Sequence, residues 1–587
     1  MWLQRKKINS FIAIALAISF SWMPMPANAA IFTNKDPVQK QAVLQTEQAY
    51  HQGVVQQTKY GTVSGLQDGA ALSWQGIPYA KAPIGDLRWK APQEPEAWAG
   101  IFQATKNGNV GIQGSKENIQ GSEDCLNLSI YRPNSQEAGL PVLVYIHGGN
   151  NQSGTNKEIA PEKLAVNANC IVVSLNYRLG LLGFNSLPAL KTGGKLEDSG
   201  NYTLLDFARA LDWLKDNAES FGGNSDNITI SGFSAGGRDV MAMLASPVFK
   251  NKYQKAISFS GGMTTADPAA SSKIIAKALA PLAVEDGVKT SLSEAEQWLL
   301  QDTQDVRDYL YGLSAERLAA SFGNARIRMS GFPHLYSDGT VLPKEGFATT
   351  SYNEVPLIML TGTNEFSAFS LGDPYFVKAQ NNQTLLSDPK TRKELAFVIK
   401  YGSEFYRLFN TEESAIKMID SYKAPIYTCA VQWGGNKSIV GDEMAELVGA
   451  THGIFLPFLT DEAIGVREKY PQAFNNQGAK DLTKKFQKYI SNFLWTGNPN
   501  SEGLVMWEAW KNKQTGPRQL LFDANRDHAI IKMSYGATSY DAIIKEIEED
   551  QTISQKEKDE IIKKVLNGRW FSKKFDKHFG NENLWIN

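Results

Sequence analysis

A short segment near the middle of the chain constrains the fold most. The β-branched run 228–230 leads into Gly-Phe-Ser-Ala-Gly at 232–236, and an apolar stretch suited to a helix, 240–244, follows. Gly-x-Ser-x-Gly between a strand and a helix is the pattern of a nucleophile elbow, in which the serine, here Ser234, stands on a strained turn. The flanking glycines avoid collisions with the neighbouring strand and helix, and the helix N-terminus favours negative charge near the serine. Because the bare pattern also arises by chance, an ordinary strand–turn–helix is the alternative.

Of the six histidines in the chain, His452 has the position that suits a catalytic base. A serine hydroxyl needs a base that takes its proton, and that base needs an acid that orients it. His452 lies in the small-residue loop 448–453, well after Ser234, and this type of fold takes its triad in the order serine, acid, histidine. A hydrogen-bonded loop or core histidine is the alternative. The remaining histidines lie in polar or charged sequence, before a turn or just after an early strand: His51, His147, His334, His528 and His578.

Glu365 is the acid that the sequence predicts. The apolar run 355–361 is typical of a buried strand, and Gly-Thr-Asn-Glu follows it at 362–365. The alternatives are Asp338, in a Ser-Asp-Gly turn where aspartate has an ordinary structural role, and Asp442 or Glu443, which stand close to His452 in the sequence.

A second glycine-rich loop follows the apolar strand 142–146, where the sequence continues His-Gly-Gly-Asn to Asn150. A tetrahedral oxyanion needs backbone N–H donors aimed at it. One donor is expected from Ala235, directly after the serine, and the others from this loop. A plain tight turn is the alternative interpretation.

Composition agrees with a large α/β enzyme. The 587 residues carry a formal net charge of −1 with no basic stripe, so nucleic acid is not an expected partner. Apolar β-rich runs alternate with helical patterns such as 204–217, which indicates a mostly parallel α/β sheet. Because the candidate catalytic residues are spread along the chain, they must close into one unit.

Together these motifs resemble the type-B carboxylesterases, the family of para-nitrobenzyl esterases, fungal lipases and cholinesterases, from about residue 60 to about residue 523. The resemblance implies an α/β-hydrolase fold with a mostly parallel central sheet flanked by helices, and helical insertions that form a gorge. Ten segments carry it: 76–80, 83–89, 123–128, 176–180, 200–206, 221–224, 338–339, 365–369, 449–453 and 496–499.

The same resemblance implies the roles of individual residues. Ser234 is expected to be the nucleophile, Glu365 the acid and His452 the base, in agreement with the reasoning above. Gly149, Asn150 and Ala235 fall on the oxyanion donors of the family. The implied activity is hydrolysis of a small-molecule carboxylic ester through an acyl-enzyme, without a metal or cofactor. Alternatives are specialisation on amides, carbamates or polyesters, or a non-catalytic cholinesterase-like binding protein.

The sequence departs from the family at several positions near the site. The acid loop is shortened around Glu365, and Phe233 stands where a buried glutamate is common. The polar residues 150–152 replace glycine and aromatic residues, which indicates a wetter pocket or, the interpretation we favour, a solvated loop. Arg238 follows the elbow where a small residue is usual. It could bind a substrate carboxylate, but pairing with an acid such as Asp239 is the favoured interpretation.

The N-terminus has the pattern of a signal peptide. A basic start at 5–7, an apolar run at 11–22 and Ala-Asn-Ala at 27–29 predict cleavage, with the mature chain beginning near Ala30. An uncleaved amphiphilic anchor is the alternative. The expected location is the periplasm or the medium, without a stable membrane anchor.

The sequence divides into three parts. We expect a signal peptide (1–29), a carboxylesterase domain (30–538) with a mainly helical insertion at 269–350, and a charged helical extension (539–587). The mixed charges of the extension favour packing on the body over docking to a membrane surface or partner. The three cysteines, Cys125, Cys170 and Cys429, lack metal-ligand spacing, so burial rather than disulfides is expected to hold the fold.

Overall fold

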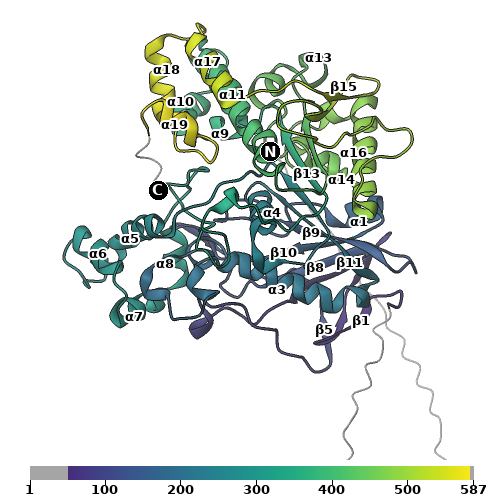
Figure 1. Cartoon of the computed structure of the whole chain (residues 1–587). Coiled ribbons are helices and arrows are strands. Elements are labelled where there is room, and N and C mark those ends of the chain that lie inside the picture. Colours follow the sequence, from purple (N-terminus) through teal and green to yellow (C-terminus); the bar gives the residue numbers. More distant parts are fainter. Residues whose placement is uncertain (1–49, 582–587) are drawn as a thin grey trace, which may run out of the picture. The chain divides into compact units, whose positions relative to one another are not determined.

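The computed structural model describes residues 50–581, so the predicted signal peptide lies outside the described residues. The centre of this part of the chain is an 11-stranded sheet (Figure 1). In spatial order its strands are β16 (Ala529–Ser534), β15 (Gln519–Ala524), β14 (Ile426–Val431), β13 (Leu357–Gly362), β12 (Lys255–Phe259), β11 (Gly223–Phe233), β9 (Leu140–Ile146), β10 (Ile171–Leu175), β8 (Asn127–Pro133), β4 (Ala71–Pro78) and β3 (Leu66–Asp68).

The sheet is mostly parallel, as the sequence predicts. The seven strands from β15 to β10 are parallel to one another, whereas β16 at one edge and β8, β4 and β3 at the other pair antiparallel. Central parallel strands are buried on both faces and are therefore apolar along their whole length. Small sheets outside the core contain β1 (Val55–Thr58), β2 (Gly61–Ser64) and β5 (Ile101–Gln103), and β6 (Gln113–Ser115) with β7 (Asn118–Gln120).

Helices cover both faces of the sheet. Alternate residues of β9 point to opposite faces: Val142 and Val144 pack with α3 (Tyr202–Asn217) and α4 (Ala235–Ala245). Leu143 and Tyr145 lie on the other face, in one cluster with α1 (Pro161–Ala168) and α16 (Gln477–Thr496). The remaining short helices near the sheet are α2 (Gly180–Gly183), α13 (Lys437–Val440), α14 (Leu456–Thr460) and α15 (Val466–Lys469).

Two groups of helices lie between β12 and β14 in the sequence. The first contains α5 (Pro268–Glu285), α6 (Leu292–Leu299), α7 (Gln304–Gly312) and α8 (Ala315–Ala320). The second contains α9 (Ser367–Leu371), α10 (Pro374–Asn381), α11 (Pro389–Asn410) and α12 (Glu412–Met418). None of the helices in residues 50–581 combines the length and the apolar run that a membrane span requires.

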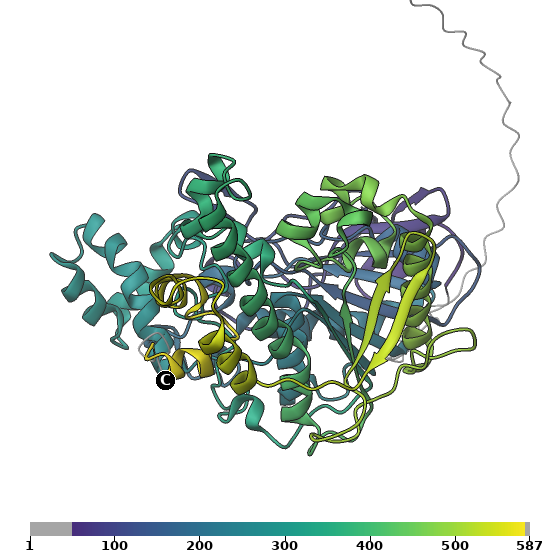
Figure 2. The same cartoon turned by 90° about the horizontal axis from the view of Figure 1, so that it is seen from above.

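The C-terminal segment folds back onto α11. Its helices are α17 (Tyr540–Glu549), α18 (Gln555–Ile561) and α19 (Lys573–His578), with a π-helical turn at Ile562–Leu566. Both views place α17–α19 beside α11 (Figures 1 and 2). Phe405 of α11 packs against Tyr540 and Phe575, with ring centroids 5.4 and 5.2 Å apart. The same apolar cluster contains Ala235, directly after the candidate nucleophile.

Candidate active site

Ser234 stands on a strained turn between β11 and α4. Its backbone has φ 58° and ψ −115°, a region that non-glycine residues rarely occupy. The turn leaves no room for side chains at its flanking glycines. A Cβ atom on Gly232 would lie 2.3 Å from the Gly236 carbonyl oxygen, and one on Gly236 would lie 2.3 Å from the Ile146 carbonyl oxygen. The elbow pattern therefore has the steric basis that the sequence predicts.

Glu365 and His452 are in direct contact. His452 Nδ1 lies 2.5 Å from Glu365 Oε2, and the Glu365 side chain is fully buried. A proton on Nδ1 donates to the carboxylate and leaves Nε2 as the acceptor. Nε2 makes no hydrogen bond within residues 50–581. Catalytic hydrogen bonds are often formed only when substrate is bound, so this geometry suits a base.

The other oxygen of Glu365 is held by three donors. Oε1 accepts from Ser260 Oγ at 2.5 Å, the Gly362 amide at 2.6 Å and Thr361 Oγ1 at 3.1 Å. These bonds fix the orientation of the carboxylate toward His452. Ser260 follows β12 and has a left-handed backbone, with φ 51°.

The alternative acids do not reach His452. Asp338 accepts backbone hydrogen bonds from residues 340–342, which is a turn role. Asp442 and Glu443 are exposed. Glu365 is thus the carboxylate that the structure brings to the imidazole.

The loop after β9 presents free amides. Gly149 and Asn150 have φ values of 98° and 59°, and neither amide donates to another described residue; the same holds for Ala235 at the start of α4. The Gly148 amide, by contrast, donates to the Glu158 carboxylate at 3.0 Å. Asn150, which tolerates a left-handed backbone better than most residues, can therefore occupy an oxyanion-donor position.

The expectation of a solvated loop at 150–152 is wrong for Asn150 and Asn151, whereas Gln152 is partly exposed. Asn150 is 9% exposed and Asn151 is fully buried. The Asn151 side chain donates to Asp239 Oδ1 at 2.9 Å, and the Asn151 backbone carbonyl accepts from the Gly180 amide at 2.7 Å. Hydrogen bonds thus replace contact with water for Asn151, whereas the buried Oδ1 of Asn150 has no hydrogen-bond partner within residues 50–581.

Two carboxyl groups support this loop, the half-buried Glu158 and the fully buried Asp239. Burial raises the pKa of Glu158 to about 7, although hydrogen bonds from Gly148 and Tyr145 oppose the rise. Burial likewise raises the pKa of Asp239 to about 7, opposed by the hydrogen bond from Asn151 and by the charge of Arg238. Both groups change charge near neutral pH without touching the triad.

Three aromatic rings surround the His452 imidazole. The ring centroids of Phe233, Phe369 and Tyr406 lie 4.6, 5.0 and 5.5 Å from it. Phe233 thus gives the imidazole an aromatic neighbour at the position where a glutamate is common in relatives. Burial raises the pKa of the Tyr406 phenol well above its ordinary value, the Glu365 charge adds to this, and the nearby Ser234 hydroxyl opposes it.

The favoured pairing of Arg238 with Asp239 is wrong. Arg238 Nη1 lies 2.7 Å from His334 Nε2, and Nη2 donates to the Thr264 carbonyl at 3.2 Å. Consecutive helical residues project in different directions, so the two side chains cannot face each other. The guanidinium lies instead over the Trp570 ring, 4.1 Å from its centroid.

Comparisons with known proteins identify the family. The sequence profile of the carboxylesterase family matches residues 52–398. The chain belongs to the carboxylesterase family. It is 31% identical over 472 residues to para-nitrobenzyl esterase from Bacillus subtilis (strain 168), covering 77% of this chain and 92% of that protein. Carboxylesterase 1D from Rattus norvegicus is also 31% identical, over 514 residues that cover 78% of this chain and 86% of that protein.

A solved structure supports the same assignment. A PNB esterase has a TM-score of 0.63 at 28% identity, covering 82% of this chain and 98% of that chain. The resemblance to the carboxylesterases and the α/β-hydrolase fold are therefore confirmed. By class, this carboxylesterase is a carboxylic ester hydrolase.

Several residues of this carboxylesterase's site lie outside the motifs. Sequence reasoning did not single out Ser260, Glu158, Tyr406 or Trp570. Only Ser260 had a local signal, since it follows a buried strand adjacent to the elbow strand. Within residues 50–581, no group of three histidine, cysteine or acidic side chains is arranged to hold a metal ion.

Proposed function

We propose that this carboxylesterase hydrolyses small-molecule carboxylic esters through a Ser234–His452–Glu365 triad. His452 Nε2 takes the proton of the Ser234 hydroxyl while Oγ attacks the ester carbonyl carbon. The carbonyl oxygen becomes an oxyanion that accepts hydrogen bonds from the amides of Gly149, Asn150 and Ala235. Glu365 holds the imidazole in the tautomer that has Nε2 free and stabilises the imidazolium.

The reaction continues through an acyl-enzyme. The imidazolium gives its proton to the alcohol oxygen, the C–O bond breaks, and the acyl group remains on Ser234. Water then gives its proton to His452 and attacks the acyl carbonyl, which releases the acid and restores the serine. The observations that carry the proposal are the 2.5 Å contact between His452 and Glu365, the strained backbone of Ser234 and the amides of Gly149, Asn150 and Ala235 without acceptors among the described residues.

The proposal extends to location and organisation. The mature enzyme begins near Ala30 and is exported to the periplasm or the medium. Residues 30–538 form the catalytic unit, with 269–350 as an insertion and 539–587 as an extension. The intact mass of protein isolated from the producing cells tests the first point, because cleavage removes residues 1–29.

A fluorophosphonate probe tests the activated serine. We expect stoichiometric labelling at Ser234, located by mass spectrometry, and complete loss of labelling and of ester hydrolysis in Ser234→Ala. Ser231→Ala is the matched control, since this buried β11 hydroxyl donates to the Val144 carbonyl and faces away from the chemistry. Absence of labelling in folded protein, or labelling at another serine, would contradict the proposed triad.

A further inference from the structure

Arg238 is a buried cation one helical turn beyond the candidate nucleophile. Its amide donates to the Ser234 carbonyl at 3.0 Å, and its side chain is fully buried. His334 holds it through Nε2, because His334 Nδ1 interacts with the Phe332 carbonyl at 2.9 Å. Burial lowers the pKa of His334 well below its ordinary value, and the charge of Arg238 lowers it further. The imidazole is therefore a neutral acceptor.

Other fully buried arginines in the described part of the chain have an acidic partner or at least two carbonyl acceptors, whereas Arg238 has one carbonyl acceptor. Arg178 pairs with Asp206 at 2.5 Å, and Arg569 pairs with Asp373 at 2.6 Å. Arg518, which lies over Trp510, donates to two backbone carbonyls. Arg238 has no ion pair within residues 50–581, and its Nε atom has no hydrogen-bond partner there.

Nearby carboxyl groups do not supply the missing partner. Asp239 accepts from Asn151 through Oδ1 alone and makes no ion pair with Arg238, and its pKa of about 7 leaves it only partly charged at neutral pH. Glu365 is occupied by His452. Arg238 itself stays protonated, because burial lowers its pKa only to about 10. Burying a cation without a paired anion is costly.

Among the described residues, three buried donors around Arg238 have no hydrogen-bond partner, and Asp239 Oδ2 is a buried acceptor without one. The donors are Arg238 Nε, Trp570 Nε1 and the Tyr406 hydroxyl, which lies near the Ser234 hydroxyl. Trp570 lies against the guanidinium. The centroid of the Tyr406 ring is 6.4 Å from that of Trp570 and 5.5 Å from that of His452. Three donors, one of them charged, favour a ligand rich in acceptor oxygens.

We propose that Arg238, Trp570 and Tyr406 form an anion subsite that binds a free carboxylate on the ester substrate. The substrate class is therefore an ester that carries a second, ionised acid group, such as a half-ester of a dicarboxylic acid. This inference rests on the proposed ester hydrolysis at Ser234 and specifies its substrate. Arg238 is a binding residue in it and takes no part in proton transfer.

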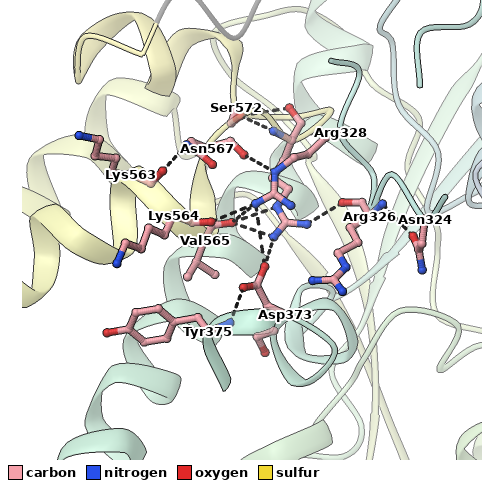
Figure 3. Close-up of polar contacts among 12 residues, drawn as sticks. Asn324, Arg326, Arg328, Asp373, Tyr375, Lys563, Lys564, Val565, Asn567 and Ser572 are labelled. Carbon is pink, nitrogen blue, oxygen red and sulfur yellow. Dashed lines mark hydrogen bonds and ion pairs between the residues drawn. The ribbon is translucent and has the colours of Figure 1, made fainter. Parts of the chain in front are cut away.

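The C-terminal extension contributes Trp570 to this subsite. The Trp570 amide donates to the Ile327 carbonyl at 3.0 Å. The neighbouring Arg569 binds Asp373 and the Arg326 carbonyl, and Arg328 donates to carbonyls of residues 564, 565 and 567 (Figure 3). This network holds the tryptophan ring in place over Arg238.

Matched pairs of esters test the subsite. The first pair, monomethyl glutarate and dimethyl glutarate, has the free carboxylate in the acyl half of the ester. The second pair has it in the alcohol half and consists of an acetoxybenzoate and the same compound with its carboxylate methylated. In wild type we expect kcat/KM to favour the anionic member about 10- to 100-fold in one series, the range for hydrogen bonds to a charged group. Arg238→Met should bring that ratio close to one.

Controls separate this inference from the function on which it rests. Arg518→Met removes an equivalent buried arginine stacked on tryptophan and should leave the ratio unchanged. Fluorophosphonate labelling of Ser234 in Arg238→Met reports whether the triad is assembled. If that variant does not fold, Tyr406→Phe removes one donor and should lower the ratio. The subsite is overturned if the wild-type ratio is near one in both series. It is also overturned if Arg238→Met or Tyr406→Phe leaves the ratio unchanged. Labelling of Ser234 would still support the proposed triad in either case.

Discussion

At the scale of single residues, the acid of the proposed triad depends on neighbours that never meet the substrate. Glu365 directs one oxygen to His452 while Ser260, Thr361 and Gly362 hold the other. Hydrogen bonds to an ionised group are worth about 1.5–3 kcal/mol each. Ser260 is thus a positioning residue, acting on the imidazole through the carboxylate.

Ser260→Ala is expected to lower kcat/KM about 10-fold or more. Loss of the hydroxyl frees the carboxylate to rotate away from the imidazole. Because the substrate does not touch the carboxylate, the loss should fall on kcat while KM changes little. Ser260→Gly, which suits the positive φ, distinguishes loss of the hydroxyl from backbone strain.

Ser258→Ala provides the matched control for that measurement. This buried serine on β12, two residues before Ser260, donates to the Gly237 carbonyl and does not touch Glu365. An unchanged kcat in Ser260→Ala, or an equal loss in Ser258→Ala, would contradict a positioning role.

Sequence reasoning predicts a functional residue when a recognisable local motif surrounds it. Ser234 lies in an elbow whose glycines are required sterically, and Glu365 directly follows a buried strand. Arg238 was misassigned because adjacency along a helix was taken as proximity, whereas its partners His334 and Trp570 come from distant segments. No local pattern marks Tyr406, whose contact with His452 depends on how α11 packs.

At the scale of elements, the site is assembled at the carboxyl ends of four central strands of the sheet. The strands β9, β11, β12 and β13 are adjacent and parallel, so their carboxyl ends lie together. The oxyanion loop, Ser234, Ser260 and Glu365 each follow one of them. Strand order could not be derived from sequence alone, because parallel neighbours are joined by long crossovers.

The C-terminal helices are fixed by a buried ion pair, and Arg569→Met is expected to release them. The substitution leaves Asp373 buried with only the more distant Arg328, at 3.9 Å, as a cation, so the cost approaches the roughly 3–5 kcal/mol of a broken buried pair without exceeding it. We expect faster hydrogen exchange across α17–α19 and a lower ester turnover, because Trp570 loses its support. Hydrogen exchange with mass spectrometry measures the first effect.

Lys564→Ala is the control for that experiment. Its partner Glu560 is four residues earlier on the surface, and exposed pairs of this kind contribute well under about 1 kcal/mol. Exchange in α17–α19 should therefore match wild type. If hydrogen exchange in Arg569→Met becomes faster elsewhere but not in α17–α19, the ion pair does not hold these helices.

At the scale of the whole molecule, burial rather than cross-linking maintains the fold. Cys125, Cys170 and Cys429 are all buried and free. The sheet has apolar clusters on both faces, and a third cluster joins the C-terminal helices to α11. Within this interior lie the carboxyl groups of Glu158 and Asp239, so stability must depend on pH.

Glu158→Gln is expected to reduce that dependence. The folded pKa of Glu158 is about 7 against an ordinary value of 4.5, so between these pH values the folded state keeps a proton that the unfolded chain has lost. Wild-type stability therefore falls as pH rises through this window, by about 1 kcal/mol per pH unit from this group. Glutamine has no such proton to lose.

Urea unfolding of both proteins between pH 5 and 8 measures the effect. The free energy of unfolding of Glu158→Gln minus that of wild type should increase up to about pH 7 and then level off. Asp239 titrates in both proteins, so its contribution cancels in the difference. A difference that stays constant with pH would show that Glu158 ionises as it does in the unfolded chain.

The place of Trp570 in the chain has a consequence for biosynthesis. A ribosome has finished Ser234, Glu365 and His452 long before it adds this tryptophan, which nevertheless packs on a side chain one turn from the serine. A premature stop codon beyond β16 would thus yield a polypeptide that carries all three residues of the proposed triad and lacks Trp570 of the proposed anion subsite. A nascent chain could therefore select anionic esters only after translation has passed Trp570, which is later than the synthesis of Ser234, Glu365 and His452.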